Sequence, residues 1–166
     1  YLQVPLIYVN QIGANDNLIF DGNSFILDKN GSKIKQLKSF SEDLSSWHIE
    51  QTIPEKKEFE QSEISSIFDA LVLGVRDYAQ KCGFKTALIG LSGGIDSALV
   101  SAIATAALGS NNIYCVSMPS KWSSSHSKSD AKDLARRLKI NFNSIPIENL
   151  MNSFEESFIK TISFEM

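Results

Sequence analysis

One stretch of the sequence constrains the fold more than any other, an apolar run that two adjacent glycines interrupt. It covers residues 87–108 and reads ALIGLSGGIDSALVSAIATAAL. Adjacent glycines weaken strands and helices alike, because they lose the most backbone entropy on folding and have no side chain to pack. We therefore predict that Ser92-Gly93-Gly94 forms a turn between a buried strand and a buried helix.

The residues beyond this turn alternate between strand and helix patterns. Strands are expected over residues 86–91, 113–119 and 142–147. One helix is expected from residue 95 to Gly109, a second behind a capping box of Ser127 and Asp130, and a third over residues 148–162. This alternation with short connections predicts an α/β fold, a doubly wound parallel sheet with helices on both faces.

The residues before the turn have a different pattern. Residues 1–40 hold short apolar runs separated by Asn, Asp and Gly, and Asn30-Gly31 predicts a two-residue hairpin turn. Residues 41–62 are polar, contain Pro54 and lack a sustained period, so we expect a linker there.

A further helix is expected directly after this linker. Apolar side chains recur with helical spacing over residues 64–78, with Ser62 as the N-cap and Gly83 at the end.

Composition excludes several classes of protein. The 166 residues are 43% hydrophobic and 21% charged, which is typical of a soluble globular protein. The net charge is −3 and Lys and Arg are scattered, so there is no basic cluster that would bind nucleic acid. No apolar stretch is long enough to cross a bilayer. Cys82 and Cys115 form neither a metal-ligand spacing nor a disulfide framework, so we expect small core residues in a cytoplasmic protein.

The predicted glycine turn has the chemistry of a phosphate-binding loop. Glycines let backbone N–H groups approach a ligand closely, and the helix that follows carries a partial positive charge at its N-terminus. The Lys of a Walker A loop is missing. Asp96 would repel a phosphate unless a cation lay between them, and Mg²⁺ resolves that conflict.

A purely structural interpretation of the same residues is also open. The glycines can form a tight turn, Ser92 can cap the helix, and Asp96 can be an acid that the helix dipole favours in the first turn. For the glycines and Ser92 taken alone, the two interpretations have equal weight.

The complete S-G-G-I-D-S after a buried strand resembles the pyrophosphate loop of the N-type ATP pyrophosphatases, which include NAD, GMP and asparagine synthetases and tRNA-thiolating enzymes. Two further stretches are similar to glutamine-dependent NAD synthetases. MPSKWSSSHSKSDA, residues 118–131, resembles the segment after the second synthetase strand. LIYVNQIGANDNLIFDGNSFILDKNG, residues 6–31, resembles the last strands of the nitrilase-type glutaminase domain that precedes the synthetase.

The resemblance implies a division of the chain into three parts. Residues 1–40 would end a nitrilase-like α/β sandwich, residues 41–62 would be the linker, and residues 63–166 would begin a synthetase domain like the adenine nucleotide alpha hydrolases. The chain would then be an internal part of a longer enzyme, with the glutaminase nucleophile upstream of Tyr1 and the catalytic residues unknown.

The resemblance also implies a reaction, the ATP-dependent amidation of deamido-NAD to NAD through an adenylated intermediate. Glutamine would supply the ammonia, and pyrophosphate and AMP would be released. The implied ATP- and pyrophosphate-binding residues are Gly90, Leu91, Ser92, Gly93, Gly94, Ile95, Asp96, Ser97 and Met118. Asp96 would also bind Mg²⁺. Met118 would lie near adenine, and a core methionine at the end of a strand is an equally open interpretation.

Some features depart from the family or leave alternatives. The family more commonly has Arg-Tyr where this chain has Lys121-Trp122, and a Lys cannot supply a bidentate guanidinium contact. For His126 we favour a solvent-exposed position in a serine-rich loop. A GMP synthetase-like or tRNA-thiolating enzyme and a non-catalytic ATP-binding module are the alternative functions. We expect a homo-oligomer that binds neither nucleic acid nor membranes.

Overall fold

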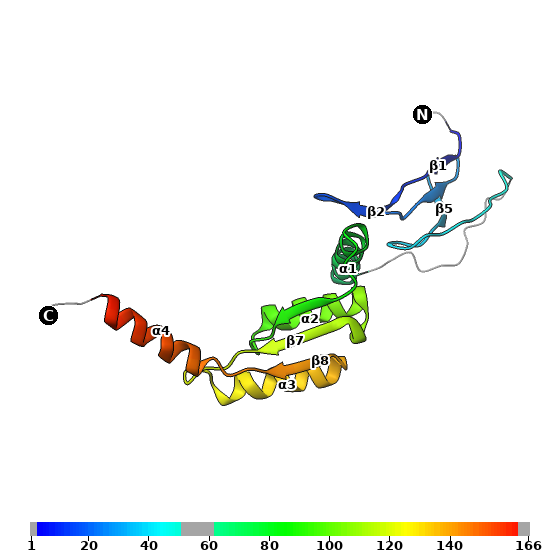
Figure 1. Cartoon of the computed structure of the whole chain (residues 1–166). Helices are drawn as coiled ribbons and strands as arrows, with labels where there is room; N and C mark the ends of the chain where they lie inside the picture. Colours follow the sequence, from blue (N-terminus) through cyan, green and yellow to red (C-terminus); the bar gives the residue numbers. More distant parts are fainter. Residues whose placement is uncertain (1–2, 51–61, 163–166) are drawn as a thin grey trace. The chain divides into compact units, whose positions relative to one another are not determined.

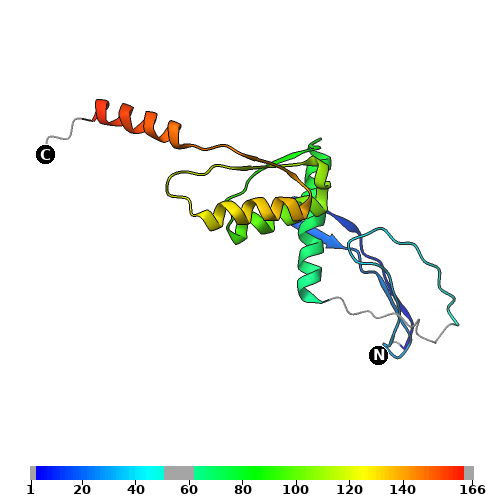
Figure 2. The same ribbon diagram turned by 90° about the horizontal axis from the view of Figure 1, so that it is seen from below.

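The computed structural model describes residues 3–50 and 62–162. Within it the chain forms two compact units, Tyr1–Gly83 and Phe84–Met166. Figures 1 and 2 show the elements of both units in two views. None of the helices in the described residues is long and apolar enough to cross a membrane.

The first unit contains antiparallel strands, as expected from the resemblance of this segment to the last strands of a glutaminase domain. One sheet has the order β1-β4-β5, and a separate two-stranded hairpin pairs β2 with β3. The strands are β1 (Leu6–Tyr8), β2 (Ile12–Asn15), β3 (Leu18–Asp21), β4 (Phe25–Leu27) and β5 (Lys33–Gln36).

The turn between β4 and β5 is longer than predicted. The N–H of Asp28 donates to the carbonyl of Ser32 at 2.8 Å, and the N–H of Gly31 donates to the carbonyl of Asp28 at 3.0 Å. Gly31 has a φ of 85°, while Asn30 is not among the residues with positive φ. The predicted two-residue turn is therefore wrong, because that turn needs positive φ at both positions.

The helix predicted after Ser62 is present as α1 (Glu63–Lys81). The hydroxyl of Ser62 accepts the N–H of Ser65 at 3.2 Å and caps the helix, and Gly83 lies just beyond its end. This prediction is confirmed. Cys82 is exposed at the C-cap of α1, so its expected place in the core is wrong, whereas Cys115 is buried. Residues 41–50 form neither helix nor strand, and residues 51–61 of the expected linker, including Pro54, lie outside the described residues.

The second unit is an α/β fold with a parallel sheet, as predicted. Strands pair in the order β6-β7-β8, both pairs parallel. Its elements are β6 (Ala87–Gly90), α2 (Ile95–Leu108), η1 (Ser110–Asn112), β7 (Ile113–Ser117), α3 (Ser125–Leu138), β8 (Asn141–Ser144) and α4 (Glu148–Thr161).

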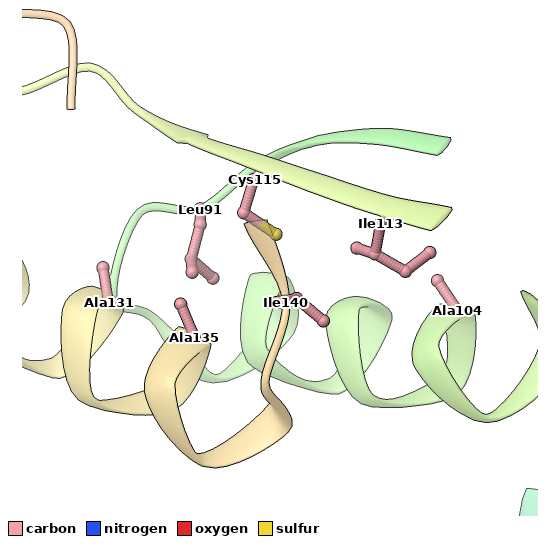
Figure 3. Packing of buried hydrophobic residues seen from close by; sticks show 7 residues of the cluster. All are labelled: Leu91, Ala104, Ile113, Cys115, Ala131, Ala135 and Ile140. Carbon is pink, nitrogen blue, oxygen red and sulfur yellow. The ribbon is translucent and has the colours of Figure 1, made fainter. Parts of the chain in front are cut away.

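The core of this unit lies between the sheet and two helices. Figure 3 shows Leu91, Ile113 and Cys115 pointing from the strand layer toward α2 and α3, which lie on the same side of it. Leu88, on β6, is 75% exposed. Helices on both faces were expected, but these two crossover helices share one face. The reason is that right-handed crossovers which continue in one direction across a sheet place successive helices on the same side.

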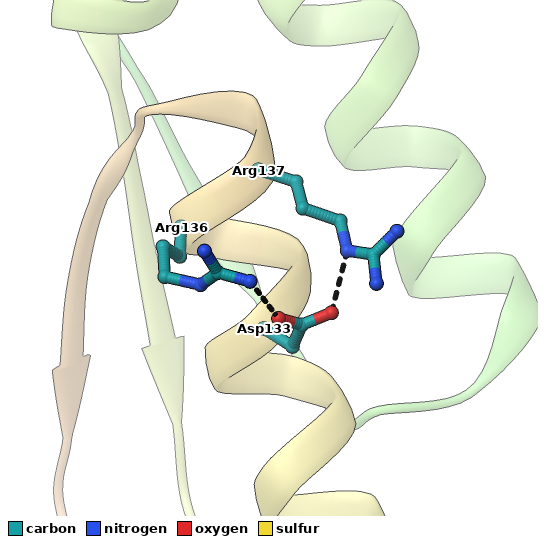
Figure 4. Close-up of polar contacts among 3 residues, drawn as sticks. All are labelled: Asp133, Arg136 and Arg137. Carbon is teal, nitrogen blue, oxygen red and sulfur yellow. Dashed lines mark hydrogen bonds and ion pairs between the residues drawn. The ribbon is translucent and has the colours of Figure 1, made fainter.

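Helix α3 begins three residues earlier than predicted. Its N-cap is Ser124, whose hydroxyl accepts the N–H of Ser127 at 3.0 Å, so the capping box at Ser127 and Asp130 is wrong. Near the end of the helix the Asp133 carboxylate forms ion pairs with two arginines (Figure 4). Its Oδ1 lies 2.6 Å from Arg136 Nη2, and its Oδ2 lies 2.5 Å from Arg137 Nε. The hydrogen bond from Arg136, and after it that from Arg137, lowers the pKa of Asp133 below its ordinary 3.8.

Candidate functional site

The predicted turn lies at the carboxyl end of β6, between the parallel sheet and α2. Leu91 anchors it, since its side chain is only 1% exposed and its N–H donates to the carbonyl of Val116 at 2.9 Å. Gly94 is the N-cap residue of α2, and as a glycine it has no side chain that could accept a hydrogen bond from the first amides of the helix. The first amide groups of a helix have no acceptor within the helix itself, so these donors are available to an anion.

Two serine hydroxyls fix the shape of this loop. The Ser97 hydroxyl accepts the N–H of Ser92 at 3.2 Å and donates to the carbonyl of Gly94 at 3.0 Å. The Ser92 hydroxyl accepts the N–H of Gly94 at 3.2 Å and lies 3.1 Å from the Ser97 hydroxyl. The loop is therefore held by its own side chains before any ligand binds, which lowers the entropy lost on binding.

Gly93 brings this loop against the first turn of α3. Its φ is 86°, and a Cβ at this position would lie 2.2 Å from the carbonyl oxygen of Ser127 and 2.8 Å from the Ser127 Cα. Backbone cannot yield as the end of a flexible side chain can, so only glycine fits. The N-terminal ends of α2 and α3 thus meet at this loop, and both helix dipoles favour negative charge there.

A cavity of about 220 Å³ opens beside the loop. Gly90, Leu91 and Ser92 form one wall, and Met118, 54% exposed, stands at the end of β7. A Cβ on Gly90 would lie 3.7 Å from the Met118 Cε. The cavity is lined by Gly90, Leu91, Ser92, Val116, Ser117, Met118, Pro119, Ser123, Ser127 and Lys128. The structure thus brings Met118 to the predicted loop from another strand.

Asp96 and Ile95 lie in the first turn of α2, and both are exposed. Within the described ranges, no cluster of three or more His, Cys, Asp or Glu side chains could hold a metal ion. Mg²⁺ is commonly bound by only one or two carboxylates together with substrate phosphates, so an isolated Asp96 beside a loop whose amide groups are available to an anion fits this kind of site.

The three side chains left open by the sequence lie near the cavity but are not among its lining residues. Lys121 and Trp122 occupy the turn after β7, and the Lys121 ammonium lies 5.5 Å from the Trp122 ring centre, a cation–π contact. Trp122 is 79% exposed, and His126 is also exposed, in the first turn of α3.

Sequence reasoning missed Ser123, Ser127 and Lys128. All three line the cavity, and Ser127 also contacts Gly93. They fall within the serine-rich stretch that the sequence singled out without assigning roles to them. The wrong prediction of the helix cap is the reason, because it placed Ser127 before α3 instead of within its first turn.

Comparison with known proteins supports the resemblance. Glutamine-dependent NAD(+) synthetase of Synechocystis is 46% identical to this chain, in an alignment that covers 94% of this chain and 29% of the relative. The enzyme of the same name from Acinetobacter baylyi is 42% identical, over 94% of this chain and 30% of the relative. The chain thus spans less than a third of the length of these curated relatives. A solved glutamine-dependent NAD+ synthetase from Acinetobacter baumannii, in complex with ADP, matches 99% of this chain and 32% of its own, at 35% identity and a TM-score of 0.85.

The sequence model of one family, NAD synthase, matches residues 67–166, which include the loop, the cavity and Met118. This match covers more than half of the chain and fits the parallel sheet with its glycine turn. The chain therefore belongs to the NAD synthase family.

Proposed function

We propose that this chain is part of a glutamine-dependent NAD synthetase, which makes NAD from deamido-NAD, ATP and ammonia released from glutamine. The observation that carries this proposal is the S-G-G-I-D-S loop at the carboxyl end of β6, closed by the first turn of α3. Relatives of that name align with 94% of the chain, including the strand-rich segment ahead of the family match.

The loop would bind the phosphates of ATP. Backbone N–H groups of Gly93, Ile95 and Asp96 would donate to the β- and γ-phosphates, and the hydroxyls of Ser92 and Ser97 would complete the cradle. Lys128 adds a cationic side chain to the adjoining cavity, and Met118 would lie against adenine. The Acinetobacter baumannii relative holds ADP, which supports an adenine nucleotide as ligand.

The reaction would need positioning and charge stabilisation more than a general acid or base. The nicotinate carboxylate of deamido-NAD attacks the α-phosphorus of ATP, and pyrophosphate leaves. Ammonia then attacks the acyl carbon of the adenylate and displaces AMP, which leaves the amide of NAD. Preorganised donors that face the leaving pyrophosphate stabilise the charge that develops on it, as this rigid loop would do.

Asp96 is the residue that would hold Mg²⁺. The ion would neutralise the pyrophosphate and act as a Lewis acid when bound. Without a cation, the Asp96 carboxylate would repel the phosphates that the loop attracts. The pairing of an exposed acid with an anion-binding turn therefore favours a metal-dependent site over a helix cap alone.

The test is turnover by the complete enzyme that contains this chain. With deamido-NAD, ATP, Mg²⁺ and ammonium, we expect NAD, AMP and pyrophosphate in equal amounts, and glutamine should replace ammonium. AMP release only with xanthosine monophosphate or tRNA as acceptor would favour a GMP synthetase-like or a tRNA-thiolating enzyme. Binding of ATP without any pyrophosphate release would leave a nucleotide-binding module.

We also propose that the enzyme is a cytoplasmic homo-oligomer. The sparse, unpaired cysteines suit a reducing compartment. The apolar side chains of Leu99 and Val100 are 52% and 53% exposed on α2, and they would suit burial against a second copy. Light scattering on the complete enzyme tests this, and a monomer at working concentration would contradict it.

A further inference from the structure

Both backbone polar groups of one residue in the β2–β3 hairpin, Ala14, bind side chains of α1. The N–H of Ala14 donates to Asp77 Oδ2 at 2.7 Å, and the Lys81 ammonium donates to the carbonyl oxygen of the same Ala14. Lys81 also reaches Asn15 Oδ1 at 3.4 Å. Asp77 and Lys81 are four residues apart, so they project from one face of the helix.

Glycines allow this close approach. A Cβ on Gly74 of α1 would lie 3.2 Å from the Cδ1 of Ile19 on β3. A Cβ on Gly13 would lie 3.3 Å from the Asp77 carboxylate. Glycine is unfavourable inside a helix, so its presence in α1, at the point of contact, is explained by this packing. We call the contact the α1–hairpin interface, formed by Gly13, Ala14 and Ile19 with Gly74, Asp77 and Lys81.

The hairpin alone would leave the backbone groups of Ala14 on an open strand edge. Such groups must bind water or another partner, and charged partners make stronger hydrogen bonds than neutral ones. Asp77 supplies an acceptor for the N–H and Lys81 a donor for the carbonyl, so the pair satisfies both backbone groups of Ala14. A neutral pair would not hold the hairpin in the same register as strongly.

The α1–hairpin interface joins two different segments of the chain. The NAD synthase family match begins at residue 67, so Gly74, Asp77 and Lys81 fall inside it. The hairpin precedes that match and belongs to the strand-rich segment that resembles the end of a glutaminase domain. Helix α1 ends at Lys81, and a short connection leads to β6 and the S-G-G-I-D-S loop. The helix is therefore packed on one segment and covalently continuous with the other.

We propose that Asp77 and Lys81 are positioning residues that couple glutamine hydrolysis to NAD formation. By fixing the hairpin on α1, they hold the preceding segment in a defined position on the helix that leads to the ATP loop. Ammonia released from glutamine then reaches the amidation site instead of the solvent. This proposal rests on the proposed function, and free ammonium bypasses the step that it concerns.

The experiment compares two nitrogen sources in the complete enzyme. In the double variant D77A/K81A, the ammonium-driven rate should stay within about twofold of the wild type. The glutamine-driven rate should fall by about tenfold, the scale expected for the loss of a charge-assisted hydrogen bond, and the glutamate released per NAD should rise. Asp16→Asn at the hairpin tip is the matched control, because Asp16 is exposed and lies outside the interface. It should change none of these quantities.

Gly74→Leu is a second variant, which wedges the interface apart without removing a charge. It should raise the ratio of glutamate to NAD as the double variant does. Equal loss with glutamine and ammonium in both variants would show a merely structural role and overturn the proposal, as would an unchanged ratio. A wild-type enzyme that makes no NAD from ammonium would instead overturn the proposed function.

Discussion

Two turns of this protein each contain a glycine with positive φ but differ in what surrounds that glycine. Gly31, between β4 and β5, has a φ of 85°, and Gly93, between β6 and α2, has a φ of 86°. A Cβ on Gly31 would meet nothing within 4 Å, whereas a Cβ on Gly93 would collide with the Ser127 backbone. The first glycine serves only the turn. The second also brings two helix N-termini together, at the loop that we propose as the phosphate-binding site.

The acids in the two turns differ in the same way. The Asp28 carboxylate accepts the N–H groups of Asn30 and Ser32, both at 2.8 Å, so its oxygens stabilise its own turn. The Asp96 carboxylate makes no hydrogen bond or ion pair with any residue that the structure describes. An acid free of such contacts beside the proposed phosphate-binding loop is available to a cation. Four substitutions test this contrast.

The largest effect is expected from Gly93→Val. The side chain would strain the backbone and force α3 away from the loop, so ATP affinity of the complete enzyme should fall by at least about 100-fold, the scale for loss of two hydrogen bonds to charged phosphate oxygens. Isothermal titration measures this, and an unchanged far-UV spectrum shows that the fold persists. Gly94→Ala is the comparison, because a Cβ there meets only the Ser92 hydroxyl at 3.3 Å. Equal, small losses in both variants would contradict a special role for Gly93.

The contact that this variant disrupts could not have been predicted from the sequence. The strand before Ser92, the helix after Gly94 and the end of that helix at Gly109 follow local rules, and the structure has them where the sequence predicts them. The start of α3 does not follow from local rules. Six serines lie between residues 120 and 129, each of them a candidate N-cap, and only packing selects Ser124. The side of the sheet that α3 covers depends on strand order, which no local pattern encodes.

The next effect concerns Asp96. If Asp96 binds Mg²⁺, Asp96→Asn should lower turnover by orders of magnitude and remove most of the Mg²⁺ dependence of ATP binding, because a hard anionic ligand is lost. If it only complements the helix dipole, the free energy of unfolding should drop by about 0.3–1 kcal/mol while ATP binding stays the same. ATP titrations with and without Mg²⁺ separate the two cases. Equal Mg²⁺ dependence in wild type and variant would show that Asp96 is a cap.

A smaller effect is expected from Gly31→Ala, the counterpart of the Gly93 substitution. The methyl group enters open space, so only the left-handed backbone is penalised, by roughly 1–2 kcal/mol in the free energy of unfolding. ATP affinity should not change. Urea unfolding gives the first quantity and titration the second. A loss of ATP affinity at Gly31 would break the contrast between the two turns.

The smallest effect is expected from Asp28→Asn, and it depends on pH. The N–H of Ser32, and after it that of Asn30, lowers the pKa of the Asp28 carboxyl below its ordinary 3.8. A carboxyl whose pKa is lowered by folding stabilises the folded state above its unfolded pKa, and this contribution is lost as the pH falls through the folded value. Asp28→Asn should therefore lower the melting temperature slightly at neutral pH, and the difference from wild type should shrink as the pH falls below 3.8 and be lost once the pH is below the lowered folded pKa.

The neutral amide of the variant can still accept one N–H, and the turn is exposed, which keeps the difference small. Asp16→Asn provides the control, since Asp16 is an exposed acid in the neighbouring hairpin turn, between β2 and β3. Melting curves of all three proteins at neutral and acidic pH give the comparison. A difference between Asp28→Asn and wild type that stays constant from neutral pH down to acid unfolding would show that the carboxylate charge does not stabilise this turn. The contrast with Asp96 would then rest on the metal experiment alone.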